Sequence, residues 1–203
     1  VKGVPRKLIY GSDYPYKETS NHMPLSAEDI IANPSFAYGG LSNVWGAAVM
    51  PYLAEDIKDW PVTLEELAPY YTKVLEFMSI AVAKDNLQSL FPLYAKKWQD
   101  FNYSRQASTL LKDLEVNKKK LNDKEIFFGS SRLAVQFEAK EKKPGCVYCG
   151  LCLHGCPYKL IYSSSFTVDE LRKDKKFNYK RNVIVENVEE KDGRVRSIAH
   201  GRI

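Results

Sequence analysis

The four cysteines of this chain fall within one eleven-residue window, with the spacing C-x2-C-x2-C-x3-C and a proline directly after the last of them. They are Cys146, Cys149, Cys152 and Cys156, followed by Pro157. Thiolates that short loops bring together select zinc or iron–sulfur clusters over hard cations. The run therefore predicts a loop that is shaped around four sulfurs and that holds a metal.

The spacing of the run distinguishes between these metals. Structural zinc usually takes two separated C-x2-C pairs, or one pair with histidines, and this chain has no second pair. A dense run that ends in Cys-Pro is typical of bacterial iron–sulfur proteins. We interpret the cysteines as ligands of an iron–sulfur cluster, with Cys156 either completing the site or left unused beside a three-iron cluster. A metal-free loop, disulfides and zinc remain alternatives, and His154 is expected to be solvated.

Composition and charge restrict the class of protein. A chain of 203 residues with 44% hydrophobic content can form one or two domains with a core. No segment approaches the ~18 consecutive apolar residues of a membrane helix. The net charge is +5, but the basic residues are mixed with acidic ones, so no nucleic-acid partner is expected. Four thiols without a signal peptide favour a reducing, cytoplasmic compartment. Both ends look cut, and we expect an interior piece of a longer protein.

Helical patterns occupy the middle of the chain. Thr63 and Glu66 have the spacing of a capping box, and apolar residues follow them at helical intervals. Pro69 should divide this pattern into two helices, at about 63–68 and 70–81. A second amphipathic helix is expected at about 105–121.

Short strands and turns dominate the rest. We expect strands at 125–128 and 132–137, and a helix that a second capping box, Thr167 with Glu170, opens and that ends near 173. Two further strands, at 183–189 and 194–200, should form a hairpin through Asp192-Gly193. These elements indicate an α+β (mixed α/β) fold.

A glycine-rich stretch is the second informative motif. Residues 38–46 read Tyr-Gly-Gly-Leu-Ser-Asn-Val-Trp-Gly. Two consecutive glycines allow a backbone to approach a ligand closely and to adopt positive φ. Ser42 and Asn43 then offer hydrogen bonds, and Trp45 can form the wall of a pocket.

Taken in order, four motifs resemble the glucose–methanol–choline (GMC) family of FAD-dependent oxidoreductases. The resemblance covers most of residues 5–200 and is poor at 84–125. The motifs are Gly39-Gly40-Leu41-Ser42-Asn43-Val44-Trp45-Gly46, Trp60-Pro61, Leu67-Ala68-Pro69-Tyr70-Tyr71, and Cys149-Gly150-x-Cys152-x-x-Gly155-Cys156-Pro157.

This resemblance implies a partial FAD/NAD(P)-binding domain with a helical insertion and part of a substrate cap. The glycine-rich loop would cover a non-covalently bound FAD, because Val44 stands where some members carry a histidine that tethers the flavin. Val185 would lie against the adenine. The implied cofactor-binding residues are Gly39, Gly40, Leu41, Ser42, Asn43, Val44, Trp45, Gly46 and Val185.

The resemblance also implies what this stretch lacks. The G-x-G-x-x-G turn that binds the pyrophosphate is absent, and the family carries it upstream of Val1. The family's catalytic histidine lies beyond Ile203, and His22, His154 and His200 match no such motif. The catalytic residues therefore stay unknown.

The function implied is oxidation of a CH–OH group of an alcohol or sugar by hydride transfer to flavin. An iron–sulfur relay would pass electrons to an acceptor protein, although similar members include oxidases as well as dehydrogenases. Residues 1–80 would supply the FAD-covering loop, 81–145 an insertion or cap, and 146–203 the cysteine loop and strands of the FAD domain. A non-enzymatic iron–sulfur electron carrier and a zinc-stapled interaction domain are the alternatives.

Overall fold

The computed structural model describes residues 13–26, 28–29, 32–83, 85–140 and 144–202. The chain divides into two compact units, Val1–Ser165 and Phe166–Ile203. The described residues form five α-helices and one antiparallel sheet of two strands. The expected mixture of α and β structure is confirmed at this level. The functional segments 1–80, 81–145 and 146–203 stay predictions, because the division into compact units does not test them.

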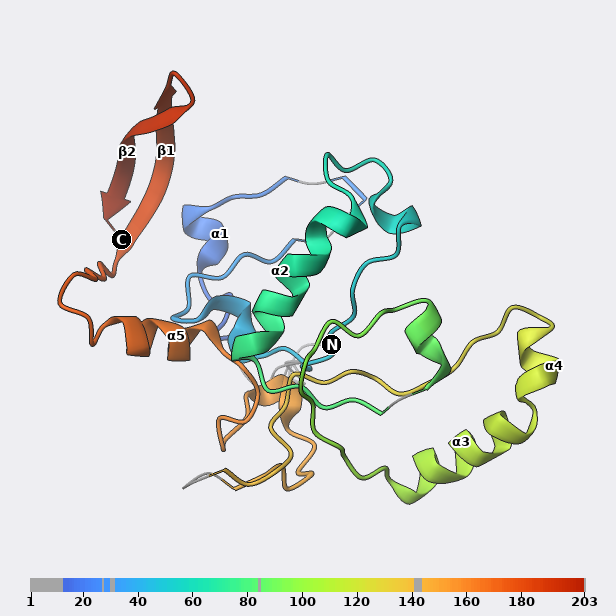
Figure 1. Cartoon of the computed structure of the whole chain (residues 1–203). Helices are drawn as coiled ribbons and strands as arrows, with labels where there is room; N and C mark the ends of the chain where they lie inside the picture. The colour runs from blue at the N-terminus through green and yellow to red at the C-terminus, as the bar shows by residue number, and fades with distance from the viewer. Residues whose placement is uncertain (1–12, 27, 30–31, 84, 141–143, 203) are drawn as a thin grey trace, which may run out of the picture. The chain divides into compact units, whose positions relative to one another are not determined.

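Four helices lie in the first unit, and α5 begins at its end. Figure 1 shows α1, α2 and α3 set apart and joined by long irregular segments, with α4 directly after α3, so these helices form no bundle. Short 3-10 turns interrupt these segments. The helices are α1 (Thr19–His22), α2 (Leu64–Phe77), α3 (Arg105–Val116), α4 (Lys118–Asn122) and α5 (Ser164–Leu171), and the 3-10 turns are η1 (Gly40–Asn43), η2 (Glu55–Ile57), η3 (Asn86–Ser89) and η4 (Cys152–His154).

Helix α2 begins at the predicted capping box and continues through its proline. The Thr63 hydroxyl accepts from the amide of Glu66, and the Glu66 carboxylate accepts from the amide of Thr63. The predicted break at Pro69 is wrong, because α2 is one helix from Leu64 to Phe77. Pro69 lies only one turn after the start. It therefore removes a single backbone hydrogen bond, to the carbonyl of Glu65, while the capping box holds the first turn.

The helix expected at 105–121 is present as two pieces. Ser104 caps α3 by accepting from the amide of Ala107 at 3.1 Å. The side chain of Asn117 donates to the carbonyl of Asp113 at 2.8 Å and separates α3 from α4. No residue of α3 is buried, and of its apolar stripe Leu111 and Leu114 are half-buried while Leu110 is exposed.

The segments expected as strands at 125–128 and 132–137 form no regular strand among the described residues. Residues 132–135 are nevertheless paired, because Leu133 bridges Ala48 and Ala81, and Val135 bridges Ile161. The segment thus joins three distant parts of the first unit. The segment is extended and its apolar residues are paired, as in a strand, but each pairing is a single bridge and no continuous ladder forms. The strand-like pattern of 132–137 therefore reflects an extended backbone without a regular strand.

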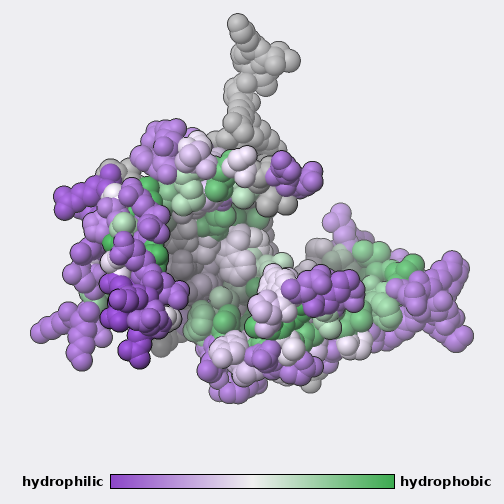
Figure 2. All heavy atoms as spheres, turned by 90° about the horizontal axis from the view of Figure 1, so that it is seen from above, coloured by the Kyte–Doolittle hydropathy of each residue, from purple (hydrophilic) through white to green (hydrophobic). Residues whose placement is uncertain are grey.

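A small apolar core lies at these pairings. It consists of Ala47, Ala134, Val135, Leu160 and Ile161, and the half-buried Cys146, Cys152 and Cys156 contact it. The core therefore holds the cysteine loop directly. Many large apolar side chains stay exposed, and Figure 2 shows hydrophobic residues reaching the surface between hydrophilic ones. Within the described part of the chain, no helix has the length and apolar character needed to cross a membrane.

The second unit contains the predicted hairpin. Strands β1 (Val183–Lys191) and β2 (Arg194–Arg202) pair antiparallel, and the register shifts twice, after Val185 and after Glu189. The turn residues Asp192 and Gly193 both have positive φ, of 56° and 69°, as expected for a tight hairpin turn.

The predicted capping box at Thr167 and Glu170 is wrong. Helix α5 already begins at Ser164, so Thr167 lies inside it. The Ser163 hydroxyl accepts from the amide of Ser165 at 3.4 Å and takes the place of the expected cap.

Candidate cofactor-binding site

The cysteine loop is fixed at both ends to the same extended segment. At its start, the amide of Cys146 donates to the carbonyl of Phe137 at 3.2 Å. At its end, the amide of Gln136 donates to the carbonyl of Leu160 at 2.9 Å. The loop between these bonds can therefore take an irregular path, with η4 inside it, and still keep its cysteines in one place.

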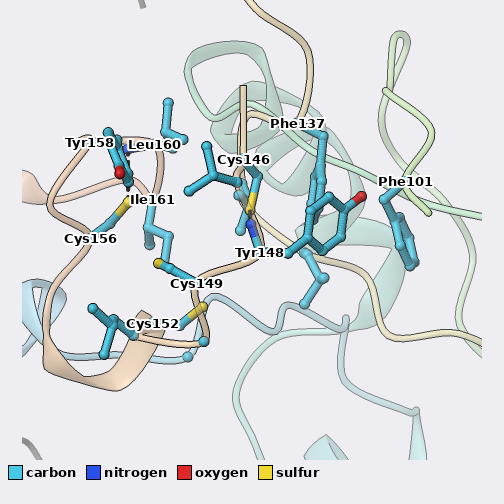
Figure 3. A pocket seen from close by; sticks show the side chains of 16 residues that line it. Phe101, Phe137, Cys146, Tyr148, Cys149, Cys152, Cys156, Tyr158, Leu160 and Ile161 are labelled. Carbon is cyan, nitrogen blue, oxygen red and sulfur yellow. Dashed lines mark hydrogen bonds between the residues drawn. The ribbon is translucent and has the colours of Figure 1, made fainter. Parts of the chain in front are cut away.

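All four cysteines line one cavity of about 270 Å³. Figure 3 shows their side chains around the same hollow, with the rings of Tyr148, Phe137 and Phe101 in a row beside it. The ring centroids of Phe137 and Tyr148 lie 5.5 Å apart, and those of Phe101 and Phe137 lie 5.4 Å apart. Almost all of the lining is apolar, and Gly46 of the glycine-rich stretch belongs to it.

The surroundings of the thiols differ. Cys149 is exposed, whereas the other three are half-buried. Burial raises the pKa of the Cys152 thiol above its ordinary value, and the neighbouring sulfurs raise this pKa further. Two sulfurs accept backbone hydrogen bonds, Cys146 from the amide of Tyr148 at 3.5 Å and Cys156 from the amide of Leu160 at 3.4 Å. Backbone amides that donate to sulfur in this way are common around cysteines that bind a metal.

The sulfurs surround the cavity without meeting at a single point. Among the described residues, which include all four cysteines, no group of three or more His, Cys, Asp or Glu side chains is placed to hold a metal ion. The donor set nevertheless suits an iron–sulfur cluster, because it offers four thiols, two amide donors to sulfur and an apolar wall.

The glycine-rich loop is a tight 3-10 turn, η1, that hydrogen bonds hold from within. The side-chain amide of Asn43 donates to the carbonyls of Tyr38 and Gly40, each at 2.9 Å. A β-carbon at Gly39 would lie 3.0 Å from atoms of Ser163 and Ser165, so glycine is needed there for close packing. Gly40 differs, because a β-carbon there would meet nothing within 4 Å. The open face of the loop is thus at Gly40.

Three consecutive serines hold this loop in place. The hydroxyl of Ser42 accepts from the amide of Ser164 at 2.9 Å and donates to the carbonyl of Gly39. Ser164 also donates to that carbonyl at 2.9 Å, and the Ser163 hydroxyl donates to the side-chain oxygen of Asn43 at 3.1 Å. The polar side chains that were expected to face a cofactor therefore bind the serine cluster, Ser163–Ser165. Sequence reasoning missed this cluster, although a serine triplet just after the cysteine loop is a visible signal.

The two motifs touch. A β-carbon at Gly155 would lie 3.2 Å from the backbone oxygen of Asn43, and one at Gly46 would lie 3.3 Å from the side chain of Leu153. The structure therefore brings together the two stretches, more than 100 residues apart, that the sequence singled out.

The remaining predicted residues have different surroundings. Val44 is buried, Leu41 is 43% exposed, and the indole of Trp45 donates to the carbonyl of Tyr162 at 2.8 Å. Val185 lies in the second unit, on β1, with its side chain 55% exposed. Its role against an adenine stays a prediction.

Residues 45–49 and 132–135 pair with each other and form a wall, called the paired wall below, between the cysteine cavity and a second cavity. The amide of Val49 donates to the carbonyl of Arg132, and the amide of Ala134 donates to the carbonyl of Ala47, each at 2.8 Å. Successive side chains of an extended segment point to opposite sides. Accordingly, Gly46 and Leu133 line the cysteine cavity, whereas Trp45, Val49 and Arg132 line the second one.

In comparisons with known proteins, no protein-family model matched the chain, and no curated protein matched it significantly. The family resemblance therefore stays a proposal that depends on the motifs and on their contact in the structure.

Proposed function

We propose that this chain is a segment of an FAD-dependent oxidoreductase that oxidises a CH–OH group of an alcohol or sugar, and that its four cysteines hold an iron–sulfur cluster. One observation carries the proposal: all four cysteines line a cavity to which Gly46 of the glycine-rich loop also contributes. Side chains on an irregular loop can point in different directions, so the fact that all four thiols face the same cavity supports a common ligand.

The residues of the loop have distinct parts in this proposal. Cys146, Cys149, Cys152 and Cys156 would be the ligands, and iron binding would draw their sulfurs closer together. The amides of Tyr148 and Leu160 would stabilise two of the thiolates by the hydrogen bonds described above. The apolar side chains around the cavity would exclude water and thereby tune the potential of the site.

The glycine-rich loop would contribute backbone rather than side chains to a flavin site. Its side-chain donors and acceptors are engaged with Ser163 and Ser164, whereas Gly40 leaves the backbone open to a ligand. A bound flavin accepts a two-electron hydride, and a cluster accepts single electrons, so the pair suits transfer to a one-electron acceptor protein. Fixing the loop through the serine cluster would keep its open face in place without a lid that must move.

The decisive experiment is anaerobic purification with a visible spectrum, an EPR spectrum and quantification of iron, sulfide, zinc and FAD. Iron with sulfide together with FAD is the expected result. Iron and sulfide without FAD would instead favour an electron carrier, and zinc without iron a zinc-stapled domain. Absence of any metal from reduced, anaerobically prepared protein would contradict the cluster.

Variants test the ligands and the relay separately. Cys149→Ser and Cys152→Ser should lose iron, whereas His154→Ser, on the same loop but exposed and outside the cavity lining, should keep it. In the flavin-loaded enzyme, the cysteine variants should slow electron delivery to an external acceptor more than flavin reduction by substrate. Equal losses in both steps would contradict a relay role.

A further inference from the structure

The second cavity, of about 260 Å³, lies on the other side of the paired wall from the cysteines. Helix α2 forms one side of it with Tyr71, Val74 and Leu75, and Leu93 and Tyr94 form another. The rings of Tyr71 and Tyr94 stack with their centroids 5.1 Å apart. The lining is almost entirely apolar, and its single charged member is Arg132.

Arg132 is an unusual residue to find there. It is only 4% exposed, and its guanidinium donates to the carbonyl of Pro92 at 3.0 Å and to that of Phe91. Among the described residues, no carboxylate forms an ion pair with it. Asp85 acts on it from a distance, while the carboxylate of Asp85 accepts from the amides of Leu87 and Ser130.

A buried cation without an anion is costly, because carbonyl dipoles replace only part of the lost hydration. The cost is greatest when the surroundings are apolar, as they are here. An arginine also has five N–H donors in a planar fork that matches a carboxylate, and the two carbonyls occupy only two of them. Charge complementarity therefore favours an anionic ligand at the Arg132 end of the cavity.

We propose that this cavity binds an amphipathic monocarboxylate, whose carboxylate pairs with Arg132 and whose apolar tail lies against Val74 and Leu93. At about 30 Å³ for each water-sized group, the cavity takes a ligand of about nine non-hydrogen atoms. A straight-chain acid of about eight carbons is close to this size. The inference is independent of the proposed cluster, because no cysteine lines this cavity.

The first test compares three probes of matched tail length by isothermal titration calorimetry: octanoate, 1-octanol and octylammonium. Octanoate should bind with one site per chain and at least about tenfold more tightly than 1-octanol, since the charge-assisted bonds distinguish the two. Octylammonium should bind most weakly. Equal affinity for acid and alcohol, or no saturable binding of octanoate, would overturn the proposal.

The second test fills the cavity without touching the arginine. Val74→Trp places a large ring in the cavity and should weaken octanoate binding at least about tenfold. Lys73→Trp is the matched control, because Lys73 is exposed on the same helix and does not line the cavity, and it should leave the affinity within about twofold. If both variants bind octanoate as the unmodified protein does, the site lies elsewhere.

Arg132→Met tests the charge itself. The variant should bind octanoate and 1-octanol with similar affinity, and retention of the acid preference would overturn the role of Arg132. If the variant fails to fold, as circular dichroism would show, the probe comparison and the Val74→Trp pair still decide the matter.

Discussion

Gly155 of the cysteine loop lies against the backbone oxygen of Asn43 in the glycine-rich loop, where a β-carbon would be only 3.2 Å from that oxygen. Gly155 also has φ 88° and ψ 129°, which residues other than glycine rarely adopt. The atom that a β-carbon at 155 would meet belongs to the backbone of Asn43, so it cannot move aside as the end of a flexible side chain would. Glycine at 155 therefore sets how closely the two motifs meet.

Gly155→Ala should lower the free energy of unfolding by about 2–3 kcal/mol, because the backbone strain and the contact with Asn43 act together. Gly150→Ala is the matched control. Gly150 has φ 74°, but a β-carbon there would meet nothing within 4 Å, so this change should cost only about 1 kcal/mol. Urea unfolding followed by circular dichroism measures both, and equal losses would show that the contact is unimportant.

Ser42→Ala should lower the free energy of unfolding by about 1–2 kcal/mol, because it leaves the half-buried amide of Ser164 without its acceptor. In Ser89→Ala the lost hydroxyl bond, to the carbonyl of Asn86, is exposed, and the change should stay within about 0.5 kcal/mol. Chemical denaturation of the two variants under the same conditions checks the difference. A similar effect for both would mean that the serine cluster does not hold the loop.

Alkylation of the metal-free, reduced protein should modify Cys149 first and Cys152 last. Cys149 is exposed, whereas Cys152 is half-buried and its pKa is raised, so a smaller fraction of its thiol is ionised near pH 8. Raising the pH should bring the labelling rates of Cys149 and Cys152 closer together, because the Cys152 thiolate then becomes more populated. Iodoacetamide labelling with mass spectrometry of the peptides gives the order, and faster labelling of Cys152 would contradict it.

Thr63→Ala should destabilise α2 by about 1 kcal/mol, because the amide of Glu66 loses the hydroxyl that caps it. Thr72→Ala, in the same helix, removes a hydroxyl that donates only to the carbonyl of Ala68, and it should be neutral or slightly stabilising. The difference in melting temperature between the Thr63→Ala and Thr72→Ala variants measures how much the cap stabilises the protein. Equal melting temperatures would argue against a contribution of the capping box to stability.

Local chemistry decided which elements the sequence could predict. The hairpin at Asp192-Gly193 and the cap at Thr63 depend on neighbours within a few residues, so their patterns are visible in the chain. Pro69 was misjudged because the cost of one lost hydrogen bond depends on the whole helix around it. The spacing of the cysteines predicts only that they lie on one short loop, and their shared cavity is visible only in the structure.

Long-range contacts decided the rest. No local pattern shows that Gly155 meets Asn43, or that the serine cluster takes up the hydrogen bonds of Ser42. Arg132 offered one signal, because it is the one charged residue between positions 126 and 137, but its partners at Phe91 and Pro92 lie about forty residues away. Whether such a residue faces solvent or a cavity depends on the tertiary fold.

Along the paired wall, neighbouring side chains line opposite cavities, so a change in the length of the wall affects both cavities at once. Inserting or deleting one residue between 132 and 135 would turn every following side chain to the opposite side. Val135, which lines the cysteine cavity, would then face the second cavity, and the cysteines would lose part of their apolar surroundings. Natural variants of this protein should therefore tolerate substitutions in this stretch far better than changes in its length.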